Sequence, residues 1–302
     1  MDGAPKCAYC ELPLSSARSH ASLVQNLVSN GLIRNEHVAA GLLGVDRALF
    51  VGPGNEGLAY LDRPVPIGSN AQISAPHVHA TALELLGDRL VRGGRILDVG
   101  SGSGFMTAAM ASIAPPAAQI LACEHMADVC EASIRNINRH DPNLLRSGRV
   151  AVRCADYRDC TNDVGGYDAI HCGAAAPELP ADLVALLRPG GRLVVPIGDP
   201  DELQWLTLVE KDLNGTTLTT TRHILVKFVP LTFAATQIGR DVVLDGSEWD
   251  RASQIRETPR QQSTKAKTTM WDALGAMFLP LCVLVFVIVS RLAPVWRGSP
   301  EL

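Results

Sequence analysis

The sequence predicts an α/β fold with a doubly wound, mostly parallel sheet. Short apolar runs rich in Val, Ile and Leu alternate with helix-like segments over residues 95–197, which is typical of parallel strands joined by crossover helices. The first of these runs ends in Asp98 and a glycine-rich turn that leads into a helix. Two later runs flank Asn214-Gly215, which predicts an antiparallel pair at one edge of the sheet.

The segment before the sheet carries helix and loop signals. Residues 22–32 and 35–43 have apolar side chains at helical spacing and predict two helices. Residues 51–70 are rich in glycine and proline and predict a long surface loop. A third helix is expected at 75–90, with Ser74 as its N-cap.

The alternating region gives the remaining elements. The predicted strands are 95–99, 119–123, 150–154, 167–172, 192–197, 204–210 and 223–229. The predicted helices are 105–113, 127–139 and 178–187.

Composition narrows the class of protein. The chain has 302 residues, enough for one large domain or two small ones. Its formal net charge of −4 offers no basic excess to neutralise a phosphate backbone, and aromatic residues are only 5%. We therefore expect no nucleic-acid partner.

The eight cysteines are irregularly spaced, which favours reduced, mostly buried thiols over a disulfide framework. Cys7 and Cys10 have the C-x-x-C spacing of zinc or redox sites. Because a second pair is missing, we expect a flexible tail there and no metal.

The C-terminal part contains an uncharged run, 273–290, with Trp271, Arg291 and Trp296 near its ends. This pattern predicts a transmembrane helix that tail-anchors a domain in the cytosol. A buried core helix or a pair of strands is the alternative. With no signal peptide evident, the predicted division is a flexible lead at 1–20, a folded domain at 21–233, a polar linker at 234–270 and a transmembrane segment at 271–296.

The turn after the first strand is the most informative motif. Gly100, Gly102 and Gly104 alternate behind Asp98, so a ligand can approach bare backbone there. The spacing departs from the pyrophosphate fingerprint G-x-G-x-x-G and resembles motif I of class I S-adenosylmethionine methyltransferases. The alternative is a glycine-rich turn that holds no ligand.

Acidic residues follow the next two strands. Glu124, followed by His125, is placed to accept hydrogen bonds from a ribose diol, although acids end many strands. Asp156 suits the edge of an adenine ring and Tyr157 its face, although Asp156 could be a solvated loop acid.

Residues 71–79 place the Ser74 hydroxyl at the junction of a loop and a helix, and the N-terminus of a helix can bind a carboxylate. His77 and His79 follow at i, i+2 spacing, but no third ligand for a metal is evident.

Over residues 22–233 the chain resembles the protein-L-isoaspartate (D-aspartate) O-methyltransferase family. The resemblance rests on Ile-Ser-Ala-Pro-His and Ile-His-Cys-Gly-Ala-Ala-Ala-Pro, and more widely on 71–79, 98–104, 167–177, 187–193 and 229–232. It implies a class I methyltransferase fold, usually monomeric, that takes S-adenosylmethionine as methyl donor. It also implies methylation of the α-carboxyl of L-isoaspartyl residues, which begins the repair of damaged proteins.

The resemblance assigns roles residue by residue. Ser74 becomes the catalytic serine and also lines the cofactor site. The other implied cofactor-site residues are Ala71, Gln72, Ile73 and His79 in the cleft, Asp98 and Gly100 toward the methionine end, Gly102 in the glycine turn, Glu124 and His125 at the ribose, Asp156 and Tyr157 at the adenine, and Thr232 across the pocket. The chain departs from the family at Ala155-Asp156-Tyr157, where Gly-Asp-Gly is usual, and in having Glu124 where Asp is common.

Two other functions stay open. Some relatives with C-terminal extensions look like ubiquitin-ligase adaptors, so a non-catalytic, membrane-tethered adaptor is one alternative. A methyltransferase for a small carboxylic acid is the other. The intact glycine motif and Ser74 favour the repair enzyme.

Overall fold

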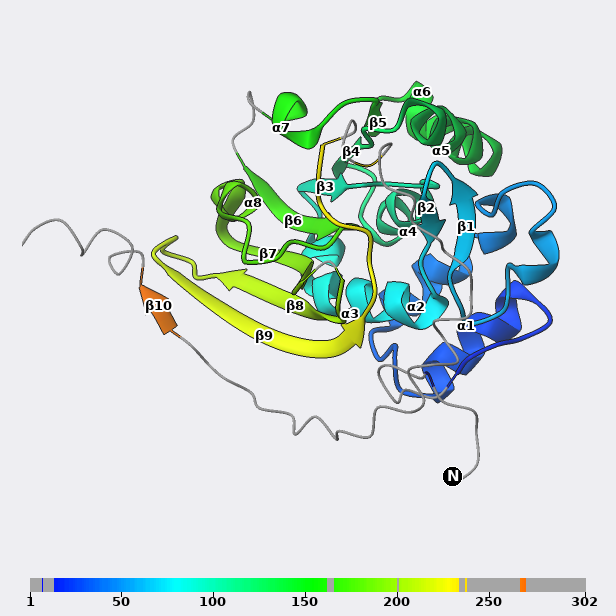
Figure 1. Cartoon of the computed structure of the whole chain (residues 1–302), viewed down its shortest axis with the longest axis horizontal. Coiled ribbons are helices and arrows are strands. Elements are labelled where there is room, and N and C mark those ends of the chain that lie inside the picture. The colour runs from blue at the N-terminus through cyan, green and yellow to red at the C-terminus, as the bar shows by residue number, and fades with distance from the viewer. Residues whose placement is uncertain are drawn as a thin grey trace, which may run out of the picture.

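The computed structural model describes residues 7, 14–161, 166–199, 201–233, 237 and 267–269. The strands of its main sheet are β3 (Arg95–Val99), β4 (Gln119–Cys123), β5 (Val150–Arg153), β6 (Tyr167–Cys172), β7 (Leu187–Ile197), β8 (Gln204–Lys211), β9 (Thr217–Val226) and β10 (Lys267–Thr269). Their order is β10-β9-β8-β7-β6-β3-β4-β5 (Figure 1). Neighbours from β5 to β7 are parallel, and those from β7 to β10 are antiparallel. The predicted parallel sheet with an antiparallel edge is confirmed.

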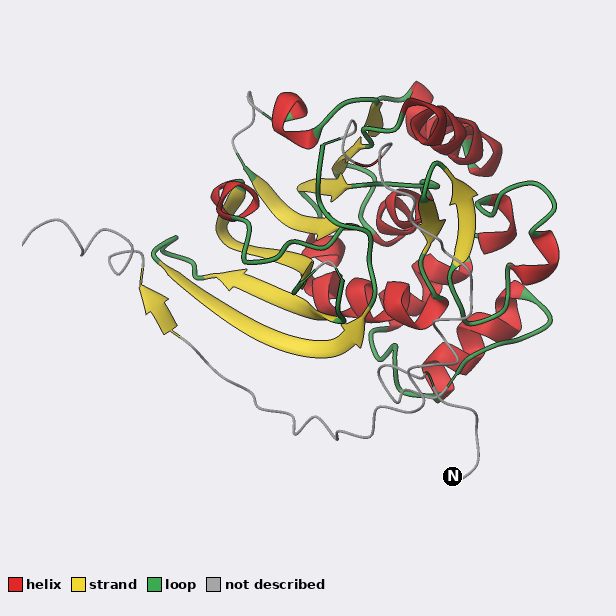
Figure 2. Ribbon diagram, in the orientation of Figure 1, coloured by secondary structure: helices red, strands yellow, loops and turns green. Residues whose placement is uncertain are grey.

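Helices cover both faces of this sheet (Figure 2). They are α1 (His20–Ser29), α2 (Glu36–Leu43), α3 (Pro76–Arg92), α4 (Phe105–Ile113), α5 (Ala127–His140), α6 (Pro142–Arg146), α7 (Tyr157–Cys160) and α8 (Ala181–Ala185), with short 3-10 turns at Arg47–Leu49 and Glu56–Leu58. Ile96 of β3 points into a core shared with α3 and α4, whereas Leu97 points into a core shared with α8. This alternation buries both faces and makes the sheet doubly wound.

Local signals explain where some of the helices begin. The Ser19 side chain accepts a hydrogen bond from the Ser22 N–H and caps α1, and Asn35 caps α2 in the same way. The prediction that Ser74 caps α3 is wrong. The N-cap is Ala75, which makes no side-chain cap, because Pro76 starts the helix one residue later than a serine cap requires.

A hairpin occupies part of the predicted loop at 51–70. Strands β1 (Val65–Gly68) and β2 (Ala71–Ile73) pair antiparallel. Ser69 and Asn70 make the reversal with φ of 46° and 55°, a left-handed conformation that non-glycine residues rarely adopt. The turn lacks glycine at these two positions, so the sequence gives little sign of it.

Other boundaries also differ from the prediction. Strand β7 begins at Leu187 and runs through Pro189-Gly190-Gly191, with a register shift against β6 where a turn was expected. Strand β9 begins at Thr217, six residues before the predicted start at 223. Helix α8 covers only the middle of the predicted 178–187.

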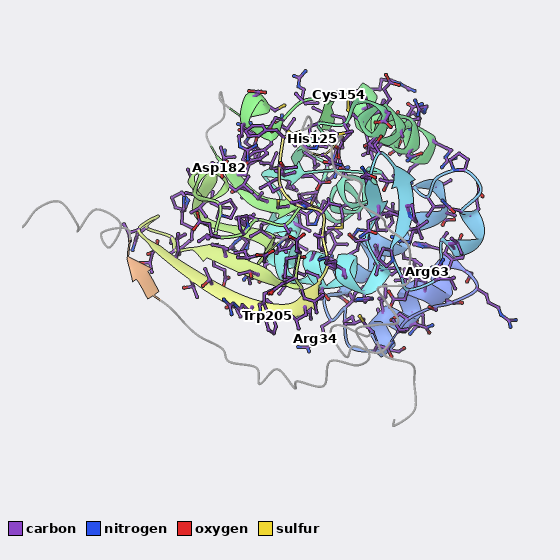
Figure 3. All side chains as sticks on the ribbon, in the orientation of Figure 1. Arg34, Arg63, His125, Cys154, Asp182 and Trp205 are labelled. Atoms are coloured by element: carbon purple, nitrogen blue, oxygen red, sulfur yellow. A yellow bond between two sulfur atoms is a disulfide. The ribbon has the colours of Figure 1, made fainter. Side chains whose placement is uncertain are left out.

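The prediction of reduced cysteines is wrong at one pair. Cys130 in the first turn of α5 and Cys154 just after β5 form a disulfide. Cys154 lies on the same side of the molecule as His125 (Figure 3). Strands β4 and β5 are neighbours, so the segments that follow them meet in space although the sequence separates the two sulfurs by 24 residues. Among the described residues, Cys7, Cys123, Cys160 and Cys172 form no disulfide.

Parts of the predicted lead and linker contact the domain. Ser15, expected in a flexible lead at 1–20, is fully buried, and its N–H donates to Asp62 over 2.8 Å. Within the expected linker, Gln237 is buried and β10 pairs with β9. The predicted transmembrane segment at 271–296 and Cys10 lie outside the described residues. In the part of the chain that is described, every helix is too short or too polar to cross a membrane.

Candidate active site

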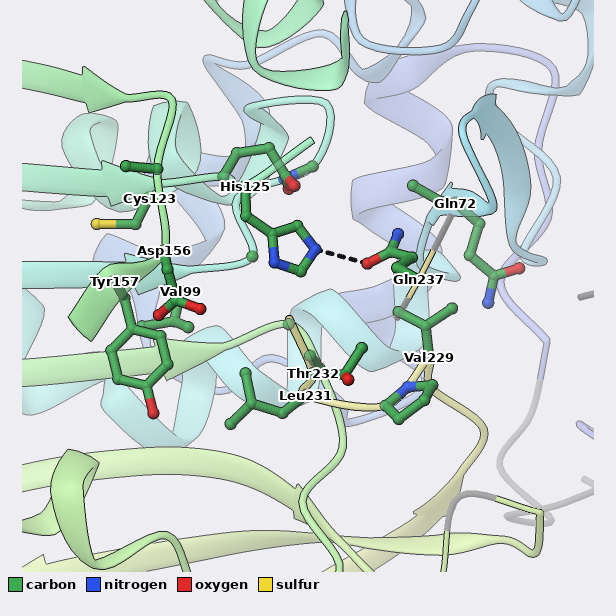
Figure 4. A pocket seen from close by; sticks show the side chains of 18 residues that line it. Gln72, Val99, Cys123, His125, Asp156, Tyr157, Val229, Leu231, Thr232 and Gln237 are labelled. Atoms are coloured by element: carbon green, nitrogen blue, oxygen red, sulfur yellow. Dashed lines mark hydrogen bonds between the residues drawn. The ribbon is translucent and has the colours of Figure 1, made fainter. Parts of the chain in front are cut away.

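A cavity that is partly open to solvent lies at the carboxyl ends of β3, β4 and β5 (Figure 4). Ligands bind at such strand ends in open α/β sheets. The predicted residues that line it are Ala71, Gln72, Gly100, Gly102, Glu124, His125, Asp156, Tyr157 and Thr232. Lining residues that the prediction missed are Val99, Cys123, Ala155, Gly173, Ala174, Val229, Pro230, Leu231 and Gln237.

The glycine turn forms the floor of the cavity. Gly100, Gly102 and Gly104 have φ of 67°, 54° and 84°, so each uses a backbone conformation that favours glycine. The end of β6 presses against this turn: a Cβ on Gly173 would lie 2.7 Å from the Gly100 carbonyl oxygen. The turn therefore exposes backbone to the cavity while its other side is packed.

Glu124 organises the loop after β4. One carboxylate oxygen accepts from the Gly102 N–H and the other from the Met126 N–H, each over 3.0 Å. Burial raises the pKa of Glu124, although both hydrogen bonds favour its ionised form. The carboxylate thus joins the glycine turn to the start of α5 and still borders the cavity.

Asp98 lies behind the cavity and does not line it. It is fully buried, accepts from the Thr107 hydroxyl over 2.5 Å, and pairs with Nδ1 of His171 over 2.8 Å. Through these two contacts Asp98 connects β3 with α4 and β6, and so stabilises the strand end from which the glycine turn begins.

Asp156 and Tyr157 form another wall. The Asp156 side chain accepts from the Arg158 N–H over 3.0 Å and caps α7. The Tyr157 hydroxyl donates to Asp182 on α8, and burial followed by this contact raises the pKa of Tyr157. Tyr157 is buried and lines the cavity, so its bulk is part of the wall.

Ser74 lines a second cavity, which Gln72 separates from the first. Gln72 borders both cavities, and Cys7 and His77 also border the second. His77 is buried, with Nδ1 2.8 Å from Asp62. Burial opposes its charged form, but hydrogen bonds with Asp62 and Cys7 raise the pKa of His77 to about 9.

Ile73 and His79 line neither of these cavities. Ile73 is buried in the core. His79 is buried with Nδ1 3.3 Å from the Arg47 guanidinium, and burial, then Arg47, hold its pKa well below the usual value. His77 and His79 therefore face different surroundings, and no three His, Cys, Asp or Glu side chains in the described ranges are arranged to hold a metal.

Among the residues that line the cavity, Gln237 is the one that the sequence pattern gave the least reason to expect. Its side-chain oxygen lies 2.6 Å from Nε2 of His125 (Figure 4), and its amide donates to the Ser69 carbonyl over 3.2 Å. Gln237 thus spans from the loop after β4 to the tip of the β1–β2 hairpin. It stands in a polar stretch whose composition indicates a linker, so no periodicity marks it.

A family model described as Protein-L-isoaspartate(D-aspartate) O-methyltransferase (PCMT) matches residues 18–236. The chain belongs to this family. It is 42% identical over 224 residues to the protein-L-isoaspartate O-methyltransferase of Triticum aestivum, covering 74% of this chain and 95% of that one. The Caenorhabditis elegans enzyme of the same name is 34% identical over 227 residues, covering 75% of this chain and 98% of that one.

One solved structure extends the comparison to the fold. It is a putative protein-L-isoaspartate O-methyltransferase of Plasmodium falciparum in complex with S-adenosyl-L-homocysteine. The two chains are 35% identical with a TM-score of 0.64, and the match covers 72% of this chain and 99% of that one. Residues 18–236 contain the whole wall of the main cavity except Gln237.

Proposed function

We propose that this protein transfers a methyl group from S-adenosylmethionine to the α-carboxyl group of L-isoaspartyl residues in damaged proteins. The observation that carries the proposal is the cavity at the carboxyl ends of β3, β4 and β5, in a chain that belongs to the isoaspartate methyltransferase family. The family membership makes it an S-adenosylmethionine-dependent carboxyl methyltransferase.

The residues of the cavity fit this methyl donor. Backbone at Gly100 and Gly102 is open for the methionine portion, since no Cβ blocks it. Glu124 has the acceptor oxygens that a ribose diol needs, and His125 lies beside it. Asp156 and Tyr157 supply an acceptor and an aromatic face for adenine.

Ala71, Gln72 and Thr232 would close the cavity from the opposite wall. Asp98, Ile73 and His79 would act indirectly, by holding the glycine turn and α3 in place.

When bound, S-adenosylmethionine supplies a methyl group that its sulfonium already activates. The acceptor carboxylate is ionised near pH 7, so the protein needs no strong general base. Its task is to align the attacking oxygen with the methyl carbon and the sulfur, and orientation of this kind lowers a barrier by several kcal/mol. We assign this alignment to the Ser74 hydroxyl, which lies across Gln72 from the cofactor cavity.

Methyl transfer to a matched peptide pair tests the function. The full chain is incubated with labelled S-adenosylmethionine and either an isoaspartyl peptide or its normal aspartyl twin. Transfer to the isoaspartyl peptide alone is expected. Cofactor binding without transfer would favour a non-catalytic adaptor, and transfer to a small carboxylic acid instead would reassign the acceptor.

We also propose that the uncharged run 273–290 spans a membrane and places the catalytic domain in the cytosol. Its length, with tryptophans at 271 and 296, supports this. The full chain should float with vesicles in a density gradient, and Leu284→Arg should reduce flotation because a central charge is costly in hydrocarbon. Flotation that is absent, or that Leu284→Arg leaves unchanged, would contradict the span.

A further inference from the structure

The side chain of Arg158 contacts residues from three segments around the cofactor cavity, namely the loop after β5 with α7, α8 and the segment 229–233. Its guanidinium Nη1 lies 3.0 and 2.9 Å from the two carboxylate oxygens of Asp156, and its Nε lies 3.3 Å from Asp182 on α8. Asp156 borders the cavity, whereas Asp182 holds the hydroxyl of Tyr157. One cation therefore joins two carboxylates that would otherwise repel each other.

The same guanidinium lies over two aromatic rings. Its central carbon lies 4.6 Å from the centroid of Tyr157 and 5.0 Å from that of Phe233. Phe233 is 62% exposed, which is unusual for so large an apolar side chain. The stacking gives this ring a partner, because a cation over an aromatic face is attracted by its quadrupole.

Phe233 connects this stack to the opposite wall. It follows Thr232 directly, and the cavity-lining residues Val229, Pro230 and Leu231 precede it. Backbone hydrogen bonds of Ala175 with Val229 and Leu231 hold the start of this segment, while the stack on Arg158 holds its end. Tyr157, the residue that departs from the family's Gly-Asp-Gly, supplies the other ring.

We propose that Arg158 is a positioning residue that fastens segment 229–233 to α7 across the cofactor cavity, and so sets how long cofactor and product stay bound. The inference rests on the proposed function only in naming the ligand. Arg158 fixes the orientation of Asp156 through the two hydrogen bonds that its Nη1 donates, while its Nε pairs with Asp182. It also fixes Thr232 through Phe233. Lysine would keep the charge but lose the planar fork and much of the stacking.

Release of S-adenosylhomocysteine, measured by stopped flow, tests this role. Arg158→Gln should speed release about tenfold, since it removes two ring contacts and two ion pairs. Phe233→Ala should speed it about threefold, and Arg158→Lys should restore part of the loss. Arg135→Gln, which breaks an exposed ion pair on α5, should release the product at the wild-type rate.

Two further readouts separate positioning from mere support of the fold. Arg158→Gln should raise KM for S-adenosylmethionine without an equal fall in kcat, since Arg158 does not touch the reacting atoms. The double variant, which combines Arg158→Gln with Phe233→Ala, should release product no faster than Arg158→Gln alone, because both substitutions remove the same contact between the guanidinium and the Phe233 ring.

Wild-type release rates in Arg158→Gln, or strictly additive effects in the double variant, would overturn the proposal. Because Phe233 is exposed, its removal leaves the core intact and keeps the test valid if Arg158→Gln misfolds. The binding assay needs no isoaspartyl peptide. Failure of methyl transfer therefore counts against the proposed function alone, whereas a wild-type chain that binds no S-adenosylhomocysteine would overturn both.

Discussion

The two walls of the cofactor cavity are built in different ways. One wall comes from the turns after β3, β4 and β5, which are neighbouring parallel strands. The other wall combines the β1–β2 hairpin, the segment 229–232 and Gln237, which are far apart in the chain. The first wall follows from local sequence, whereas the second exists only after the whole domain has folded.

The walls also differ in chemistry. The strand-end wall carries Glu124 and Asp156, whose oxygens are held by backbone N–H groups. The opposite wall presents neutral groups to the cavity, among them Gln72, Thr232 and Gln237. We infer that the first wall provides most of the cofactor affinity. The second wall closes the cavity and leads to Ser74 in the adjoining one.

The largest effect is expected at the strand-end wall. Glu124→Ala should weaken S-adenosylhomocysteine binding about 100-fold, because two N–H groups lose a charged acceptor and the ribose loses its partner. Calorimetry measures this affinity. Glu124→Gln should bind with intermediate affinity, and Glu131→Ala on the exposed side of α5 is the matched control. Near-native binding by Glu124→Ala would remove Glu124 from the cofactor site.

A smaller effect is expected from the opposite wall. Gln237→Ala should raise KM for S-adenosylmethionine about fivefold, because it removes the bridge between His125 and the hairpin tip. Gln25→Ala, which removes an exposed side-chain bond on α1, serves as control. If Gln237→Ala matched Glu124→Ala in severity, the two walls would not differ as described.

A change in pH should act on the ion pair of His77 with Asp62, beside the cavity that Ser74 lines. The pKa of His77 is raised to about 9 in the folded chain, above its unfolded value near 6.5. Its stabilising contribution is therefore complete below about pH 6.5 and is lost as the pH rises through about 9. Between pH 7 and 9.5 the Tm should fall by about 5 °C.

The variant His77→Gln locates the source of this pH effect. It should have a lower Tm at pH 7 and lack the His77-dependent part of the alkaline decline, because it cannot carry the charge that pairs with Asp62. An equal decline in both proteins would assign the effect to other groups.

The local sequence pattern predicted the main site residues of the strand-end wall, whereas Ala71, Gln72 and Thr232 of the opposite wall were predicted only through the resemblance to the family. Strands β3, β4 and β6 match the predicted boundaries because their apolar runs end at clear turn signals. Gly100, Gly102, Glu124 and Asp156 line the cavity because parallel strands deliver their carboxyl ends to one edge. Here the local pattern and the site coincide.

Where sequence reasoning failed, tertiary contacts decided the outcome. Asp98 precedes the glycine turn, but its carboxylate turns inward to Thr107 and His171. The link between Cys130 and Cys154 depends on β4 and β5 being adjacent, which spacing alone does not reveal. Gln237 reaches the cavity from a polar stretch by two long-range hydrogen bonds.

The central claim is that the strand-end wall binds the cofactor whereas Ser74 aligns the acceptor carboxylate. Its most direct test is Ser74→Ala, measured for both kcat on an isoaspartyl peptide and affinity for S-adenosylhomocysteine. We predict that kcat falls about tenfold or more, as loss of one orienting hydrogen bond implies, while the affinity stays within about twofold. Ser29→Ala on the exposed side of α1 controls for loss of a hydroxyl. An unchanged kcat, or an affinity that falls as far as kcat, would contradict the account.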